Sequence, residues 1–433
     1  MNLRQYPAYR DSGVEWLGEV PKSWGLCRLG TRFFERREKV SDADYPPLSV
    51  TKNGIVPQLD TAAKTDDGDN RKKVCCGDFV INSRSDRKGS SGLASQEGSV
   101  SLINIVLEPL KVEPDFISFL LKSVPFQEEF YRNGKGIVAD LWSTHFSEMK
   151  DILLPLPSVE EQAAIATYLD RETAKIDELV IEKERLIELL KEKRQALISH
   201  AVTKGLDPNV PMKDSGVEWL GEVPRHWQVK KFKQIVSIPI TDGPHETPEF
   251  IEQGVPFVSA EAVSSGYIDF QKIRGFISRE DHARYSLKYL PQLNDIFMVK
   301  SGATTGITAL VVEDVEFNIW SPLAVIRCGR EVVPLFVLSF MRSRHFLEAI
   351  KLSWNFGTQQ NIGMGVLEEL FCVQPPIAEQ QAIATYLDRE TAKIDSLIAD
   401  CSKAIDLLKE KRSVLISAVV TGKVDVRHLV EAI

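Results

Sequence analysis

This chain of 433 residues contains no long hydrophobic run and no paired cysteine motif. Because no stretch of eighteen apolar residues occurs, the sequence predicts no membrane-spanning helix. Its first residues lack the apolar core of a secretory signal, and we therefore expect a cytoplasmic protein. The six cysteines form no C-x-x-C pair, which favours reduced thiols over disulfides or a metal site.

Motifs of catalysis are also missing. The chain has neither a G-x-G-x-x-G fingerprint after a strand nor a G-x-x-x-x-G-K-[ST] phosphate loop. It lacks an Asn/Asp-Pro-Pro-Tyr/Phe box that would hold a flipped adenine. Glu148-Met149-Lys150 matches the E-x-K of some nucleases but has no Pro-Asp partner before a strand, and the seven histidines show no ligand spacing. We therefore predict no catalytic residue, no metal and no cofactor in this chain.

The composition is that of a folded protein with more than one domain. Hydrophobic residues make up 43% of the chain and charged residues 26%, as in soluble globular proteins. At this length two or more domains are expected. The net charge of −8 argues against a free-standing nucleic-acid binder, which usually carries a basic surplus. A DNA-binding function would thus require locally basic surfaces and a partner that neutralises part of the phosphate charge.

An internal repeat is the clearest feature of the sequence. Residues 11–21 recur unchanged as residues 214–224, at an offset of 203. Residues 161–177 recur as residues 379–395 with 16 of 17 positions identical, at an offset of 218. The chain is therefore an entry motif, a variable segment and a long helix, each present twice. This contrast indicates that the matched blocks make equivalent contacts, while the two variable blocks have different functions. The alternative explanation is that gene conversion has kept only the matched blocks identical.

Both copies of the second block open a long amphipathic helix. Pro157 and Ser158 suit the approach and cap of the first helix, and Gly205 and Gly422 are stop signals. Apolar residues follow at spacings of three, four and seven, as in a coiled coil. The seam residues are Ile165, Leu169, Ile176, Leu179, Leu186, Leu190 and Leu197 in the first copy, and Ile383, Leu387, Ile394, Leu397, Leu408 and Leu415 in the second. We predict that the two helices pack antiparallel against each other; the alternative is that each folds onto its own domain.

The variable blocks, residues 25–155 and 228–373, contain short β-type runs punctuated by Gly, Pro and Asp, with one helix-like patch each. Both are α/β mixtures large enough for a core of their own. Alignment of Asp78 with Asp295 places a basic, Gly-rich turn of the first block opposite residues 299–306 of the second. Two domains that bind different ligands would show such a common scaffold with different polar loops.

Basic residues cluster in the first block although it holds 18 basic and 19 acidic residues. Such clusters can contact phosphates, and polar loop residues can recognise base edges; a solvated surface explains each cluster equally well. The clusters are Arg28, Arg32, Arg36, Arg37 and Lys39; Arg71, Lys72 and Lys73; and Arg84, Arg87 and Lys88. The candidates for DNA contact are Lys52, Asn53, Arg84, Arg87 and Lys88 in the first block and Thr241, His245, Lys300, Thr304, Gln359 and Gln360 in the second.

The matched motifs resemble those of a known family, the specificity (S) subunits of Type I restriction-modification systems. The similarity lies in the entry motif Asp-Ser-Gly-Val-Glu-Trp-Leu-Gly-Glu-Val-Pro-x-x-Trp, in the Glu-Gln-x-Ala-Ile-Ala-x-Tyr-Leu-Asp helix start, and in residues 241–245. The resemblance covers essentially the whole chain, and its motifs occur in both copies of the repeat. It implies an α+β fold in which two target recognition domains are joined by an antiparallel coiled coil, with a pseudo-twofold repeat.

The resemblance also implies partners and a division into parts. Each recognition domain would bind one half of a bipartite, asymmetric double-stranded DNA site. The helices would dock two methyltransferase (M) subunits, which bind S-adenosylmethionine, and restriction (R) subunits would join that complex, with one copy of this chain. We expect recognition domains at 1–155 (entry motif 10–24) and 206–373 (entry motif 213–227), central helices at 156–205 and 374–425, and a tail at 426–433. The partner-docking candidates are Glu161, Gln162, Tyr168, Arg171, Glu379, Gln380, Tyr386 and Arg389.

Two other functions were considered as alternatives. A coiled-coil scaffold whose domains bind proteins or peptides would also need the helices. A self-contained nuclease or methyltransferase conflicts with the missing motifs. The sequence therefore favours a non-catalytic DNA-recognition subunit.

Overall fold

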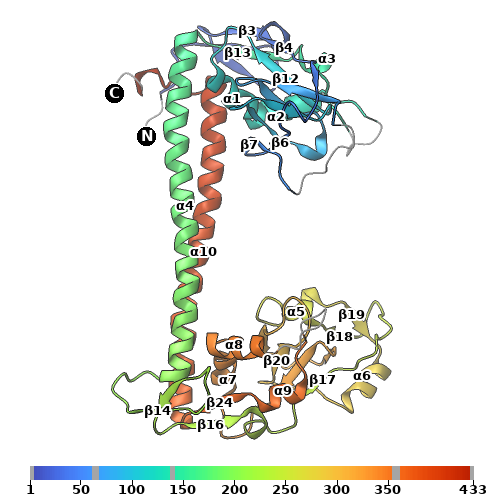
Figure 1. Ribbon diagram of the computed structural model, residues 1–433, viewed down its shortest axis with the longest axis vertical. Coiled ribbons are helices and arrows are strands. Elements are labelled where there is room, and N and C mark those ends of the chain that lie inside the picture. Colours follow the sequence, from blue (N-terminus) through green and yellow to red (C-terminus); the bar gives the residue numbers. More distant parts are fainter. Residues whose placement is uncertain (1–3, 61–67, 137–141, 354–360, 430–433) are drawn as a thin grey trace. The chain divides into compact units, whose positions relative to one another are not determined.

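The computed structural model describes residues 4–60, 68–136, 142–353 and 361–429. The chain forms two compact units (Figure 1). Unit 1 contains Met1–Glu184 and Lys403–Ile433, and unit 2 contains Arg185–Ser402. Each unit thus includes parts of both long helices, α4 (Val159–Lys204) and α10 (Ile377–Val420). None of the helices in the described ranges is long and apolar enough to cross a membrane.

Unit 1 is built on a four-stranded antiparallel sheet with the strand order β10-β9-β12-β4. Helices α1 and α2 pack against it, and Phe79, Leu107, Phe116 and Phe130 lie in the same fully buried core. The remaining strands form a three-stranded sheet and three pairs. The bounds are β1 Tyr9–Asp11, β2 Glu19–Pro21, β3 Gly25–Arg28, β4 Phe33–Glu35, β5 Lys39–Val40, β6 Leu48–Thr51, β7 Gly54–Pro57, β8 Arg71–Val74, β9 Phe79–Asn82, β10 Ser91–Leu93, β11 Gly98–Val100, β12 Asn104–Pro109, α1 Pro114–Lys122, α2 Val124–Arg132, α3 Phe146–Met149 and β13 Leu153–Leu156.

Unit 2 repeats this plan from a different sequence. Its main sheet has the strand order β21-β20-β23-β17. These four strands occupy, in this order, the positions of β10, β9, β12 and β4 in unit 1. Helices α7 and α8 correspond to α1 and α2, whereas the three-stranded sheet differs, because β18 pairs in parallel with β22. The bounds are β14 Met212–Asp214, β15 Glu222–Pro224, β16 Gln228–Lys231, β17 Thr241–Asp242, β18 Val255–Val258, α5 Ala260–Val263, β19 Gly275–Ile277, α6 Arg279–Ser286, β20 Ile296–Val299, β21 Thr308–Leu310, β22 Asn318–Ile319, β23 Leu323–Ile326, α7 Pro334–Met341, α8 Arg344–Leu352, α9 Met364–Glu369 and β24 Phe371–Gln374.

One antiparallel strand pair encloses the variable block in each unit. In unit 1, β3 pairs with β13 and places Gly25 opposite Leu156. In unit 2, β16 pairs with β24 and places Gln228 opposite Gln374. The two ends of each variable block therefore lie side by side, and the block leaves and rejoins the repeated framework at one point.

The long helices run antiparallel within each unit. In unit 1, Ile165 of α4 shares a core with Val419 of α10, and Arg412 donates two hydrogen bonds to Asp177 at 2.9 and 3.1 Å. In unit 2, the equivalent pair Arg194 and Asp395 is joined at 2.8 and 3.3 Å. Some predicted seam positions were wrong, because Leu179, Leu186 and Leu397 are 44%, 40% and 51% exposed. A straight helix drifts by about 20° per heptad against a strict seven-residue spacing, which moves such positions out of the seam.

The end of each long helix lies against an entry motif. After α10, the backbone N–H of Asp425 donates to the carbonyl of Arg4 at 2.8 Å, and the ammonium of Lys423 donates to the carbonyl of Leu17 at 3.0 Å. The segment that follows the second long helix therefore lies against the first entry motif. Gly422 and Gly205 end the two helices with φ of +75° and +81°, the left-handed conformation that favours glycine.

We expect Gly422→Ala to destabilise the protein by roughly 2 kcal/mol more than Gly205→Ala. Both variants place a side chain at positive φ, at a similar cost of about 1–2 kcal/mol. A Cβ at Gly422 would in addition overlap the ring of Pro21 and lie 3.1 Å from Trp24, whereas at Gly205 its nearest neighbour is Trp227 at 3.3 Å. Urea denaturation of both variants measures the difference, and equal losses would contradict this account.

Candidate nucleic-acid interface

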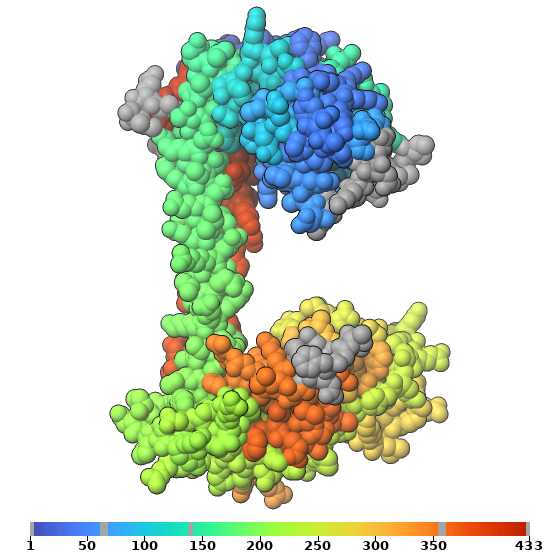
Figure 2. All heavy atoms as spheres, viewed as in Figure 1, coloured from blue at the N-terminus to red at the C-terminus, as the bar shows by residue number. Residues whose placement is uncertain are grey.

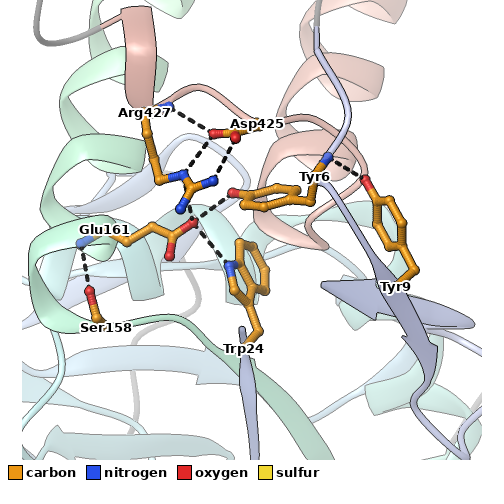
Figure 3. A network of polar contacts seen from close by, with 7 residues as sticks. All are labelled: Tyr6, Tyr9, Trp24, Ser158, Glu161, Asp425 and Arg427. Carbon is orange, nitrogen blue, oxygen red and sulfur yellow. Dashed lines mark hydrogen bonds and ion pairs between the residues drawn. The ribbon is translucent and has the colours of Figure 1, made fainter. Parts of the chain in front are cut away.

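A hydrogen-bond network in unit 1 joins the entry motif to the start of α4 (Figure 3). The buried indole of Trp24 donates to Glu161 at 3.0 Å, and the hydroxyl of Tyr6 donates to the same oxygen at 2.8 Å. In unit 2, Trp227 donates to Glu379 at 2.9 Å. The carboxylate that opens each repeated helix thus binds the tryptophan that ends each entry motif.

The adjoining glutamines hold the variable blocks to the helices. The amide of Gln162 donates to the carbonyl of Pro157 at 2.9 Å and accepts from the N–H of Glu113 at 2.9 Å. Gln380 makes the equivalent contacts with Pro375 and Val333, both at 2.8 Å. Both glutamines are at most 1% exposed.

Burial corrects part of the predicted docking set. Gln162, Gln380 and Tyr168 lie inside the fold, and a fully enclosed side chain offers no surface to a partner. Arg171 is half-buried, with 34% of its side chain exposed, whereas Arg389 is 65% exposed. Their guanidinium groups lie 5.6 Å from the ring of Tyr168 and 5.8 Å from that of Tyr386. The two arginines therefore keep part of their surface accessible to a partner.

Four of the predicted DNA-contacting residues of unit 1 gather around one loop cluster. Lys52 and Asn53 form the exposed tip of the β6–β7 hairpin, and Arg87 and Lys88 belong to the turn after β9. Lys52 and Arg87 both line a cleft of about 590 Å³, together with Asn82, Asn104 and other polar residues. This cleft combines cations with amide and hydroxyl groups, which are the groups that recognise phosphates and base edges.

Local ion pairs restrain the same turn. Arg84 pairs with Asp86 at 3.0 Å, Arg87 approaches the same carboxylate at 3.7 Å, and Lys88 pairs with Glu128. All of these partners are substantially exposed, so the pairs are weak in water. A polyanion could therefore displace these carboxylates from the basic side chains at a small cost in free energy.

Three residues of the other basic clusters of the first block make contacts within the fold. Arg36 makes a two-point contact with the buried Asp78 at 2.8 and 3.1 Å. Arg71 is 4% exposed and donates to the hydroxyl of Ser99 at 2.8 Å, and Lys72 lies 3.2 Å from Glu35. These three cations therefore stabilise the fold, whereas Arg28 and Arg37 are 68% and 75% exposed.

In unit 2, the predicted residues of the 241–245 turn surround a buried carboxylate. Asp242 is 0% exposed and lies 3.2 Å from the ammonium of Lys300, 2.5 Å from that of Lys288 and 3.1 Å from the imidazole of His245. Burial raises the pKa of Asp242, but the two lysines outweigh burial, so that its pKa lies below the usual value. A Cβ on Gly243 would overlap the carbonyl of Ile319, so this turn requires glycine.

This arrangement changes the role predicted for Lys300. Its side chain is only 12% exposed and neutralises Asp242, so it stabilises the turn rather than presenting a free cation. His245 is 69% exposed, and Thr241 and Thr304 are half-buried. Gln359 and Gln360 lie outside the residues that the structure describes.

The loops of the two variable blocks are joined in the same way. Arg84 forms a β-bridge with Ser143, and Ser301 forms the equivalent bridge with Asn361. The N–H of Thr144 donates to Ser83 at 3.0 Å, as that of Ile362 donates to Lys300 at 2.9 Å. The predicted alignment of the two blocks is thus reproduced in backbone contacts that periodicity alone could not reveal. No group of metal-ligating side chains occurs in the described ranges.

Comparison with known proteins agrees with the sequence resemblance. No protein-family model matches the chain. The chain is 24% identical over 438 residues to the Type I restriction enzyme MjaVIII specificity subunit of Methanocaldococcus jannaschii, covering 95% of both chains. It is 26% identical over 266 residues to the EcoBI specificity subunit of Escherichia coli, covering 59% of this chain and 55% of that one. The prediction of similarity to Type I specificity subunits is confirmed.

Solved structures show the same fold. The HsdS subunit of Thermoanaerobacter tengcongensis superposes with a TM-score of 0.56 at 17% identity, covering 94% of this chain and 98% of that one. A chain of a type I R-M system, solved to explain complex assembly and conformational transition, superposes with a TM-score of 0.70 at 16% identity, covering 93% and 98%. The α+β class expected from the sequence is confirmed by these neighbours and by the mixed helices and sheets.

Proposed function

We propose that this chain is the DNA-recognition subunit of a Type I restriction-modification complex and has no catalytic site of its own. The observation that carries the proposal is the pair of matching frameworks with different loops. Both four-stranded sheets have the same order, and the same bridges join their loops. The polar residues on those loops differ, since Arg84 and Arg87 of unit 1 stand opposite Ser301 and Thr304 of unit 2. Each domain then recognises its own base sequence.

The antiparallel helices extend this proposal to a bipartite site. Helices α4 and α10 have 46 and 44 residues, and each contributes one end to each unit. A helix of this length spans on the order of 65 Å. As an antiparallel coiled coil, the pair would hold the two recognition domains at a fixed separation, which corresponds to a nonspecific spacer between two half-sites.

The repeated helix surface supports two docking sites for methyltransferase subunits. Figure 2 shows in green a face of α4 that no other part of the chain covers. Exposed leucines recur at equivalent positions, with Leu179 and Leu397 exposed by 44% and 51% and Leu189 and Leu407 by 53% and 56%. Apolar side chains exposed in matching places mark a protein-binding surface. The M subunits supply S-adenosylmethionine chemistry, R subunits join them, and the complex acts in the cytoplasm on double-stranded DNA.

The test is to mix the full chain with its M subunit and to follow DNA binding and adenine methylation. We expect weak binding by the chain alone and tight, salt-sensitive binding by the mixture, with methylated adenines confined to one bipartite sequence. A mixture that gains no sequence-specific binding over either component would refute the proposal. A chain that instead captures peptides would support the scaffold alternative.

A further inference from the structure

Each unit contains a basic cleft where the recognition domain meets the long helices. In unit 1 the cleft has a volume of about 740 Å³, and in unit 2 one of about 760 Å³. The first is lined by Lys52, Lys88, Lys122 and Arg412 and by a single carboxylate, that of Asp177. The second is lined by Arg194, Arg342 and Lys351 and again by one carboxylate, that of Asp395. Both clefts are therefore net positive in a chain whose net charge is −8.

The two clefts are built from corresponding positions. Their walls share the interhelical ion pair, which is Arg412 with Asp177 in unit 1 and Arg194 with Asp395 in unit 2. A glycine at positive φ lines both, Gly89 at +86° in one and Gly306 at +94° in the other. The basic residue just before the N-cap serine of the second hairpin helix also corresponds, Lys122 in unit 1 and Arg342 in unit 2. Unrelated variable blocks thus present the same charge at the same place.

The cations of these clefts keep donors that no described residue uses. Arg412 and Arg194 bind their aspartates through Nε and Nη2 only, which leaves Nη1 available. Lys122 forms no ion pair within the described residues, and burial together with the nearby Arg412 lowers its pKa. Arg342 donates to the carbonyls of Gly266 and Thr308 at 2.5 and 2.9 Å, with no carboxylate partner. Uncompensated cations in a half-buried cleft favour an anion.

We propose that these two clefts bind phosphates of the DNA backbone, one on each half of the recognised site. This inference rests on the proposed function and adds contacts that do not depend on base sequence. Two cations of each cleft stand at corresponding positions, Lys122 and Arg412 in unit 1 and Arg342 and Arg194 in unit 2, while the base-facing loops differ. The clefts would therefore fix the register of the duplex against the helices in the same way in both halves.

The test uses Lys122→Gln and Lys351→Gln, singly and together, in the full chain with its M subunit. Binding to a random-sequence duplex is measured from about 50 to about 200 mM KCl. Each lost phosphate contact should lower the slope of log K against log[KCl] by about 0.9, and the double variant should lose about 1.8. Lys122→Arg should keep the original slope, and so should Lys193→Gln, which removes an exposed α4 lysine that lines neither cleft.

The outcomes separate this inference from the proposed function. Unchanged slopes in variants with unchanged unfolding temperatures, while methylation stays sequence-specific, would overturn the phosphate clefts and leave the recognition function intact. An equal change in Lys193→Gln would also overturn them, because it would reflect general charge. A complex that binds no duplex at all would overturn both.

Discussion

A chain in which residues 228–373 are replaced by the matching segment of another specificity subunit should methylate a sequence that is changed in one half only. The replaced block begins and ends in a single strand ladder, where Gln228 lies opposite Gln374. The new segment can therefore enter and leave at the same point without moving the helices. Its loops, including the 241–245 turn, would bring a different set of base contacts. Mapping methylated adenines in cells that carry the exchanged subunit measures the outcome.

The reciprocal exchange is the matched control. Residues 25–155 are enclosed by the ladder of β3 and β13, so their replacement should change the other half-site. Both exchanges should leave the spacer length unaltered, because α4 and α10 are untouched. A change in both halves after a single exchange would show that the units do not recognise DNA independently.

The second large effect, on stability, is expected from Asp295, whose carboxylate directly precedes strand β20. We expect Asp295→Ala to destabilise unit 2 by about 3 kcal/mol, because it leaves a guanidinium with no counter-ion in a mostly buried place. Asp295 is 1% exposed and accepts two hydrogen bonds from Arg327 at 2.7 Å, one from the hydroxyl of Tyr289 at 2.5 Å and one from the N–H of Gln292 at 2.8 Å. Urea denaturation gives the loss, and hydrogen exchange of residues 289–327 locates it.

Two further variants control this prediction. Asp295→Ala combined with Arg327→Met should recover part of the lost stability, since it removes the unpaired cation. Asp78→Ala should produce a smaller loss in unit 1, because Arg36 binds Asp78 through two contacts but would keep the carboxylate of Glu108 at 3.1 Å. A loss no greater than that of an exposed Asp→Ala substitution would mean that the pair contributes nothing to the fold.

Periodicity and repetition were sufficient to predict the framework. The two helices begin and end within a few residues of the caps and stop signals named from the sequence, at Val159–Lys204 and Ile377–Val420. The burial of Gln162 was also predictable, since it lies three residues before Ile165 and seven before Leu169, on the same helix face. Its selection as a partner-docking candidate overlooked that spacing.

The side-chain pairs within the loops could not be predicted from the sequence. Lys300 is held by Asp242, 58 residues earlier in the chain, and Trp24 by Glu161 after 137 residues. No local pattern links partners that far apart, and a lysine in a Gly-rich turn looks the same whether it faces solvent or a buried carboxylate. The two clefts could not be predicted for the same reason, because each combines residues of a loop, a helical hairpin and both long helices.

The division of the chain has a consequence for its synthesis on the ribosome. Unit 2 is made of consecutive residues, 185–402, whereas unit 1 needs residues from both ends of that stretch. The face of α4 that carries Ile165 and Leu169 packs against Ile416, Val419 and Val420, which are translated after all of unit 2. The first part of unit 1 therefore emerges early but must keep part of its apolar surface uncovered until these residues have been made, while unit 2 can complete its core sooner.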